Sequence, residues 1–219
     1  MNKAFIFDMD GVLVDSERIW AIEESEFMTG LFGKEITDKI GSTMGVSVNE
    51  VYRKAIGYGA LIKKDVFVRK FDEIATSIYS RAKLMGGTDI LVDHLISSGF
   101  KLGLVSASRM NGIEQVLRQL PFRDLFEVVI SINDSNLPSK PAPDGYLKAL
   151  KQLGADSKRS VVLEDSNRGI VSGKAAGCYV IGFRGLIVDG YKQEGADAYA
   201  DTMTDVVRLV ANRQTQGSL

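Results

Sequence analysis

Two carboxylates, Asp8 and Asp10, directly follow an apolar run near the start of the chain, and Gly11 follows them. A short apolar run that stops at a turn signal predicts a strand buried on both faces. In an open parallel sheet, ligands bind at the carboxyl ends of the strands. A carboxylate can attack phosphorus when a divalent cation screens the repulsion, and a second carboxyl group can move the protons. We therefore predict Asp8 as a nucleophile and Asp10 as a general acid and base, the alternative being a plain turn.

A second apolar run, residues 102–105, ends in small hydroxyl residues. The Ser106 hydroxyl could donate to a phosphate oxygen. The backbone amides of Ala107 and Ser108 could join it if a helix that begins near Asn111 presents its amino end there. The same serines could instead only cap that helix. This segment is therefore a candidate phosphate-binding loop.

Lys140 lies between prolines in the segment Ser-Lys-Pro-Ala-Pro-Asp, residues 139–144. Two prolines make this segment rigid and non-helical. An ammonium group that is held in place can neutralise the oxygens of a phosphoryl group in transfer. Lys140 is therefore a second candidate for phosphate binding, although most lysines are solvated surface groups.

A third apolar run ends in acids, Glu164 and Asp165, at residues 161–166. With Asp8 and the backbone carbonyl of Asp10, Asp165 would complete an oxygen site suited to Mg²⁺. Glu164 would then support the site from behind. The acids could also only favour the amino end of a helix that starts at Asn167, and both interpretations can hold together.

In this order, the four segments resemble the haloacid dehalogenase superfamily, and within it the β-phosphoglucomutase-like and phosphoglycolate phosphatase-like branch. The resemblance spans nearly the whole chain and rests on Asp-X-Asp-Gly-Val-X-X-Asp-Ser at 8–16, the strand-end serine at 106, Lys-Pro-X-Pro-Asp at 140–144 and Glu-Asp-Ser at 164–166 with Gly169. It implies Asp8 as nucleophile, Asp10 as acid and base, Ser106 and Lys140 as phosphate binders, and Asp165 as a Mg²⁺ ligand. It also implies a helical cap.

Strand patterns alternate with helical ones, which predicts an α/β fold with a doubly wound parallel sheet. The expected strands lie near residues 4–8, 102–105, 127–130, 161–164 and 179–183. Residues 15–86 differ, because their apolar spacing is helical and a structureless loop of that length is rare. Ser47 and Glu50 there fit a capping box that opens a helix. We predict a helical cap at 15–86, hinges near Asp15 and Gly86-Gly87, and a catalytic core at 1–14 and 87–219.

The cap should choose the substrate. Trp20 could cover a sugar or another small leaving group, or pack between cap helices. The flexible segment 41–45 could reach the active site. The hexose phosphomutases that the chain resembles carry a cap histidine where this chain has Trp20, and a cap arginine where it has Val48. These departures favour a Mg²⁺-dependent phosphatase, acting through an aspartyl phosphate on a small sugar phosphate, over a mutase. Arg109, beside Ser108, could bind a second anionic group of the substrate.

Two further classes of protein share part of this pattern. A dehalogenase needs neither Mg²⁺ nor a proton for an alkoxide, so Asp10 and the Glu164-Asp165 pair would be idle. A non-enzymatic phospho-receiver also combines acids, a hydroxyl residue and a lysine on a parallel sheet. Such a module carries adjacent acids on its first strand, whereas Met9 separates the two here, and it needs no helical insert. Both classes fit the chain less well than a phosphatase.

The composition sets the remaining expectations. A formal net charge of −1 gives no sign of nucleic-acid binding, and the single Cys178 excludes an intramolecular disulfide. The first residues lead directly into the predicted catalytic strand, with no apolar stretch long enough for a signal peptide or a membrane span. We expect a cytoplasmic protein that binds a small phosphorylated metabolite and neither nucleic acid nor membrane. No coiled-coil heptad is visible, and a monomer is expected.

Overall fold

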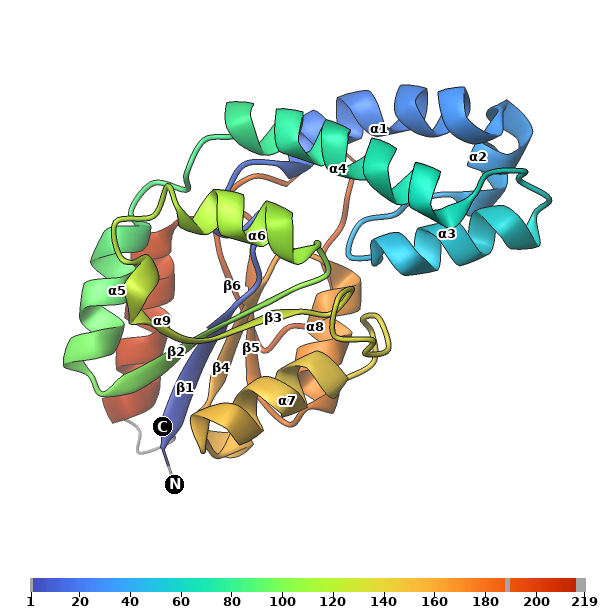
Figure 1. Cartoon of the computed structure of the whole chain (residues 1–219). Coiled ribbons are helices and arrows are strands. Elements are labelled where there is room, and N and C mark those ends of the chain that lie inside the picture. Colours follow the sequence, from blue (N-terminus) through green and yellow to red (C-terminus); the bar gives the residue numbers. More distant parts are fainter. Residues whose placement is uncertain (1, 188–189, 216–219) are drawn as a thin grey trace.

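The computed structural model describes residues 2–187 and 190–215 and contains one parallel sheet (Figure 1). Its strand order is β3-β2-β1-β4-β5-β6, and each neighbouring pair is parallel. The strands are β1 (Lys3–Phe7), β2 (Phe100–Ser106), β3 (Phe126–Ser131), β4 (Val161–Glu164), β5 (Tyr179–Phe183) and β6 (Ala198–Ala200). The predicted doubly wound parallel sheet is confirmed, since the order runs in opposite directions from β1 and β4.

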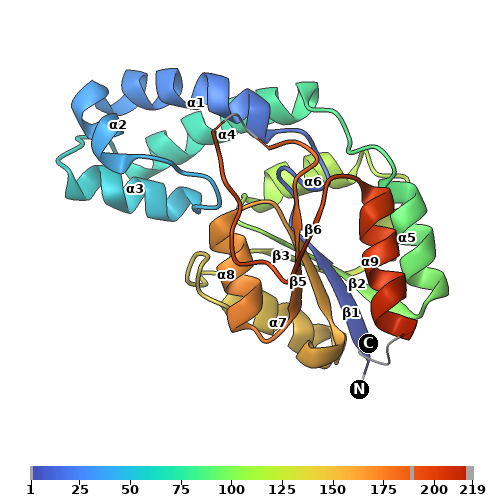
Figure 2. The same cartoon turned by 180° about the vertical axis from the view of Figure 1, so that it is seen from behind.

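Helices cover both faces of the sheet, because alternate residues of each buried strand point to opposite faces (Figures 1 and 2). On β1, Phe5 and Phe7 pack into the cluster with α5, α6 and α9, whereas Ala4 and Ile6 face α7 and α8. These helices are α5 (Thr88–Ser97), α6 (Met110–Leu117), α7 (Asp144–Leu153), α8 (Asn167–Ala175) and α9 (Met203–Thr215). Both faces are apolar, as a sheet covered on each side requires.

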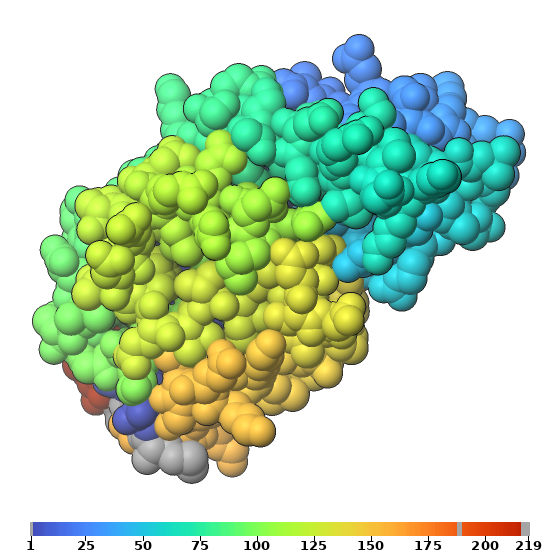
Figure 3. All heavy atoms as spheres, in the orientation of Figure 1, coloured from blue at the N-terminus to red at the C-terminus, as the bar shows by residue number. Residues whose placement is uncertain are grey.

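Four helices between β1 and α5 lie over one end of the sheet (Figure 1), and they form a separate lobe in the space-filling view (Figure 3). They are α1 (Glu17–Phe32), α2 (Lys34–Ile40), α3 (Val48–Gly57) and α4 (Lys64–Arg81). The lobe has an apolar core of its own, which includes Met28, Val51 and Phe67. Ser47 caps α3 as predicted, because its side chain accepts from the amide of Glu50.

The two connections between this lobe and the sheet lie side by side. The amide of Asp15 donates to the carbonyl of Lys83 at 2.8 Å, and the amide of Met85 donates to the carbonyl of Leu13 at 2.9 Å. A cap at residues 15–86 that moves on these connections stays a prediction. Across the described ranges, no helix combines the length and the apolar character needed to cross a membrane.

Candidate active site

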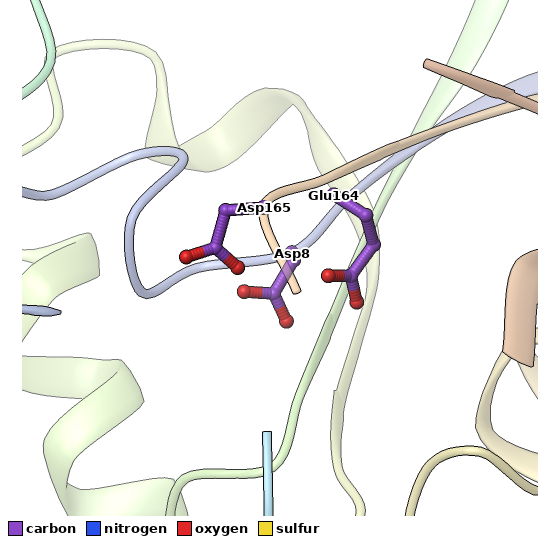
Figure 4. Close-up of side chains that lie close together, drawn as sticks. All are labelled: Asp8, Glu164 and Asp165. Carbon is purple, nitrogen blue, oxygen red and sulfur yellow. The ribbon is translucent and has the colours of Figure 1, made fainter. Parts of the chain in front are cut away.

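The candidate active site lies where β1 and β4 run side by side and the strand order reverses. Asp8 follows β1, and Glu164 and Asp165 stand at the end of β4, so the three carboxylates meet at one edge of the sheet (Figure 4). Asp8 lies between the other two. Their oxygen atoms lie within 4.8 Å of one another. Topology alone therefore brings together residues that are more than 150 positions apart, at the edge where parallel sheets bind ligands.

Lys140 supplies the positive charge beneath this cluster. Its ammonium nitrogen lies 2.5 Å from Oδ1 of Asp8 and 2.5 Å from Oε1 of Glu164, and it also donates to the carbonyl of Val105 at 3.3 Å. The side chain is 1% exposed. Because the ammonium group is paired with two buried carboxylates, the pKa of Lys140 is raised despite its own desolvation. Lys140 therefore stays charged and joins the strand ends.

Glu164 is fully used in holding this arrangement. Besides Lys140, the Tyr146 hydroxyl donates to its Oε1 at 2.7 Å, and the amide and hydroxyl of Ser166 donate to its Oε2. A Cβ at Gly169 would lie 1.8 Å from Oε1, so this helix position accepts only glycine. Both oxygens of Glu164 are therefore occupied by contacts within the site, and its role in supporting the site from behind stays a prediction.

The carboxylate of Asp10 accepts hydrogen bonds from three hydroxyl groups. Ser16 donates to its Oδ1 at 2.6 Å, and Ser108 and Tyr79 donate to its Oδ2 at 2.8 Å and 3.3 Å. Burial raises the pKa of Asp10, and the three hydrogen bonds oppose that shift because they favour the carboxylate. A carboxyl group balanced in this way suits a task that needs both protonation states. Tyr79 belongs to α4 and therefore links the lobe to Asp10.

A divalent cation fits beside Asp8 and Asp165. Burial raises the pKa of Asp8 to about 8, although the nearby ammonium of Lys140 lowers it. Burial, and after it the negative charge of Glu17, raises the pKa of Asp165 well above its usual value. Such crowding of carboxylates is unfavourable without positive charge. The chain also turns closely around this point, since a Cβ at Gly11, which has a φ of 71°, would lie 2.1 Å from Oδ2 of Asp165. The donor set matches the few carboxylates that Mg²⁺ prefers.

The predicted phosphate-binding loop follows β2. Ser106 is buried, and its hydroxyl accepts from the amide of Ser108 at 3.0 Å, while Ser131 holds the carbonyl of Ser108 at 2.7 Å. Ala107 and Ser108 line the cavity described next, but Ser106 does not. Helix α6 begins at Met110, close to the predicted start. Phosphate binding by Ser106, Ala107 and Lys140 stays a prediction.

A cavity of about 360 Å³ joins the carboxylates to the helical lobe. Its size lies in the range of small-molecule sites. Trp20 lines the cavity and also stacks on Phe71 of α4, with ring centroids 5.2 Å apart. Trp20 therefore packs between cap helices and also faces the cavity. Residues 42–45 line it as well, and a Cβ at Gly45 would lie 3.1 Å from the hydroxyl of Ser166. Segment 41–45 therefore reaches the catalytic edge, as predicted.

The comparisons with known proteins agree with this geometry. A model of the haloacid dehalogenase-like hydrolase family matches residues 5–183. The chain belongs to this family. Hexitol phosphatase B of Escherichia coli strain K12 is 33% identical over 179 residues, which are 79% of this chain and 79% of that protein.

Two solved structures share the fold. The crystal structure of CbbY from Rhodobacter sphaeroides in complex with phosphate has a TM-score of 0.76 at 23% identity, and the match covers 94% of this chain and 96% of that chain. A putative β-phosphoglucomutase from Thermotoga maritima has a TM-score of 0.67 at 23% identity, covering 96% of this chain and 99% of the other. The predicted family is confirmed, and this member is a phosphatase.

Sequence reasoning missed several residues of the site, among them three polar residues of the helical lobe. Glu17 and Glu24 line the cavity, and Tyr79 contacts Asp10. Burial and the charge of Asp10 raise the pKa of Glu17 well above its usual value. The sequence offers a signal for Glu17 alone of these three, since it directly follows the motif at residues 8–16. It offers none for Glu24 and Tyr79, because their positions in the site depend on how the lobe folds over the sheet.

Arg109 does not belong to the described residues that line the cavity. Its guanidinium pairs with Asp72 at 3.3 Å and Asp134 at 3.7 Å, and it is absent from the cavity lining. The pair with Asp72 joins the core to α4. Binding of a substrate group by Arg109 would require these pairs to break and stays a prediction.

The amino end of α3 is bound to loops of the sheet part. The amide of Asn49 donates to the Asn133 side-chain oxygen at 2.9 Å, and the Asn49 side chain donates to the Asn133 carbonyl at 3.1 Å. The hydroxyls of Ser47 and Ser139 lie 2.6 Å apart. Arg168 of α8 pairs with Glu50 at 3.3 Å. The lobe is therefore held over the cavity by direct polar contacts.

Proposed function

We propose that the chain is a Mg²⁺-dependent phosphatase that hydrolyses a small sugar phosphate through an aspartyl phosphate on Asp8. The observation that carries this proposal is the meeting of Asp8, Lys140 and Asp165 at the β1–β4 edge, beneath the helical lobe. Such a site offers a nucleophile, a fixed positive charge and a place for a cation.

The chain's own residues divide the reaction into two displacements. In the first, a carboxylate oxygen of Asp8 forms a bond to phosphorus, the bond to the leaving oxygen breaks, and Asp10 gives that oxygen its proton. In the second, water attacks the phosphorus, Asp10 takes a proton from it, and the bond to Asp8 breaks to release inorganic phosphate. Lys140 stabilises the charge that develops at the phosphoryl oxygens.

Asp8, Asp165 and the carbonyl of Asp10 would hold Mg²⁺. When bound, the ion supplies the charge that screens the repulsion between the carboxylate and the phosphate. The lobe covers the cavity and orients the leaving group of the substrate, so that Asp8 rather than water is the first group to attack phosphorus. The buried position of Asp8, which is 6% exposed, supports that role.

A sugar phosphate is the proposed substrate class because the cavity is of small-molecule size and because one relative is named as a hexitol phosphatase. A mutase would need a distal phosphate site. Val48, where the related mutases are expected to have arginine, lines the cavity as an apolar side chain. Among the described residues, the cavity lining includes no lysine or arginine to bind such a distal phosphate.

Phosphate release from a panel of small phosphate monoesters, with Mg²⁺ and with excess EDTA, tests the proposal. We expect Mg²⁺-dependent release that is highest for sugar or polyol phosphates and is abolished in Asp8→Asn. The exposed Asp124→Asn is the matched control and should keep full activity. Release that persists in Asp8→Asn, or is unaffected by EDTA, would contradict it.

A further inference from the structure

We propose that the lobe end of the cavity selects a substrate with an uncharged, hydroxyl-rich leaving group and rejects one that carries a second anionic group, with Glu24 as a specificity-determining residue. This inference rests on the proposed function and deepens it. It excludes bisphosphates and phosphorylated acids, which a sugar phosphatase could otherwise accept.

The first observation is the charge of the cavity lining. The described residues that form it include no lysine, arginine or histidine. Two carboxylates, Glu17 and Glu24, enter it from α1, in addition to Asp8, Asp10 and Asp165 at the catalytic edge. A second phosphate or carboxylate would therefore face negative charge in a partly desolvated space, where like charges repel strongly.

The second observation concerns the positive groups that border the cavity. Arg168 lies against Gly45, because its Cβ would be 3.5 Å from a Cβ at that glycine, but its guanidinium is paired with Glu50. Arg109 follows the lining residue Ser108 and is paired with Asp72 and Asp134. Lys140 is buried beneath Asp8. Each positive group is therefore engaged by carboxylates that an incoming anion would have to displace.

The third observation is the arrangement of Glu24. Thr43 of segment 41–45 donates to Oε1 of Glu24, which holds the Glu24 side chain at the cavity wall. Burial raises the pKa of Glu24, and the Thr43 hydrogen bond opposes the shift. A carboxylate fixed in this way accepts hydrogen bonds from hydroxyl groups and repels anions. Because Thr43 comes from a different segment than Glu24, both are in place only when the lobe is folded as observed.

Part of the wall is apolar and suits the carbon skeleton of a polyol. Val48, Val51 and Phe71 line it, and Trp20 is stacked on Phe71. A sugar or polyol presents both C–H faces and hydroxyl groups, so a wall that combines an aromatic face with fixed carboxylates matches it.

Matched pairs of phosphate monoesters test the inference. Each pair contains a polyol phosphate and the sugar-acid phosphate of the same carbon number, and a hexose bisphosphate completes the set. With Mg²⁺, we expect kcat/KM for the neutral member to exceed that for the anionic member by ~10²-fold or more. Glu24→Gln should narrow this ratio by ~10-fold, because one charge is removed while an oxygen that accepts from Thr43 remains.

Glu26→Gln is the control, since Glu26 is exposed on the same helix and its change in charge is the same. It should leave the ratio unchanged. Equal or better turnover of the anionic members, or an unchanged ratio in Glu24→Gln, would overturn the inference while leaving the phosphatase in place. Absence of Mg²⁺-dependent release from every member would overturn the proposed function and the inference with it.

Discussion

Replacing Lys140 by Met tests the charge arrangement of the site, because it keeps most of the apolar stem and removes the ammonium group. Two buried carboxylates, Asp8 and Glu164, would lose a partner at 2.5 Å. Breaking a buried ion pair by removing one partner costs about 3–5 kcal/mol of stability. Removing a fixed group that stabilises transition-state charge lowers kcat by ~10²–10³-fold. We therefore expect both losses together in Lys140→Met.

The loss of stability should depend on pH. The pKa of Asp8 is raised to about 8 in the folded protein although Lys140 lowers it, so the variant's Asp8 should have a still higher pKa. At a pH between the Asp8 pKa of the folded parent and that of the folded variant, Asp8 is protonated in the variant and ionised in the parent. The parent therefore gains stability over the variant as the pH rises above about 8. As the pH falls below that value, the protonated fraction of Asp8 rises in both proteins, so the difference in stability narrows.

Urea unfolding of the metal-free protein at ~pH 6 and at ~pH 9 would measure this gap, with turnover measured in parallel. Lys151→Met, an exposed change on α7, is the matched control and should leave stability and turnover nearly unchanged. A loss of stability below ~1 kcal/mol with retained turnover, or a gap that narrows as the pH rises, would refute the reasoning.

Three further predictions concern the contacts around the site. Tyr79→Phe removes a hydrogen bond that lowers the pKa of Asp10, so this pKa should rise, and the acid limb of the pH profile for phosphoenzyme hydrolysis should move to higher pH; an unmoved limb would count against the contact. Asn49→Ala removes one hydrogen bond to Asn133, and kcat/KM should fall ~5-fold, corresponding to about 1 kcal/mol, with the melting temperature nearly constant; unchanged steady-state kinetics would show that this bond does not hold the lobe. Burial raises the pKa of Cys178 to about 12, so a thiol reagent at neutral pH should modify it only after unfolding; rapid modification of the folded protein would contradict its burial.

Most of the sheet could be predicted from the sequence because each long strand is an apolar run with a polar end. The exception is β6, the segment Ala198–Ala200, which is short and lacks such a run. Its position is set by pairing with β5, where Ile181 lies opposite Ala198. A local sequence pattern cannot predict a strand that forms only because it pairs with a neighbouring strand.

The core part of the site was also open to prediction, for a topological reason. Asp8 and Asp165 stand at strand ends, and a parallel sheet brings such ends to one edge. The contacts made by the helical lobe depend instead on how one folded unit lies on another. Tyr79 reads as one more apolar helix residue, and Arg109 reads as a free cation until the fold brings Asp72 beside it.

The most direct test of the central claim is to look for the phosphoryl group on Asp8. Rapid mixing of the Mg²⁺-loaded Asp10→Asn protein with an aryl phosphate, whose leaving group departs without a proton from Asp10, is followed by acid quenching and peptide mass spectrometry. It should find one phosphoryl group on Asp8, because the first step no longer needs Asp10 whereas hydrolysis of the intermediate is slowed. The Asp8→Asn protein should carry none. Single-turnover release of phosphate with no phosphorylated Asp8 peptide at any time would contradict the account.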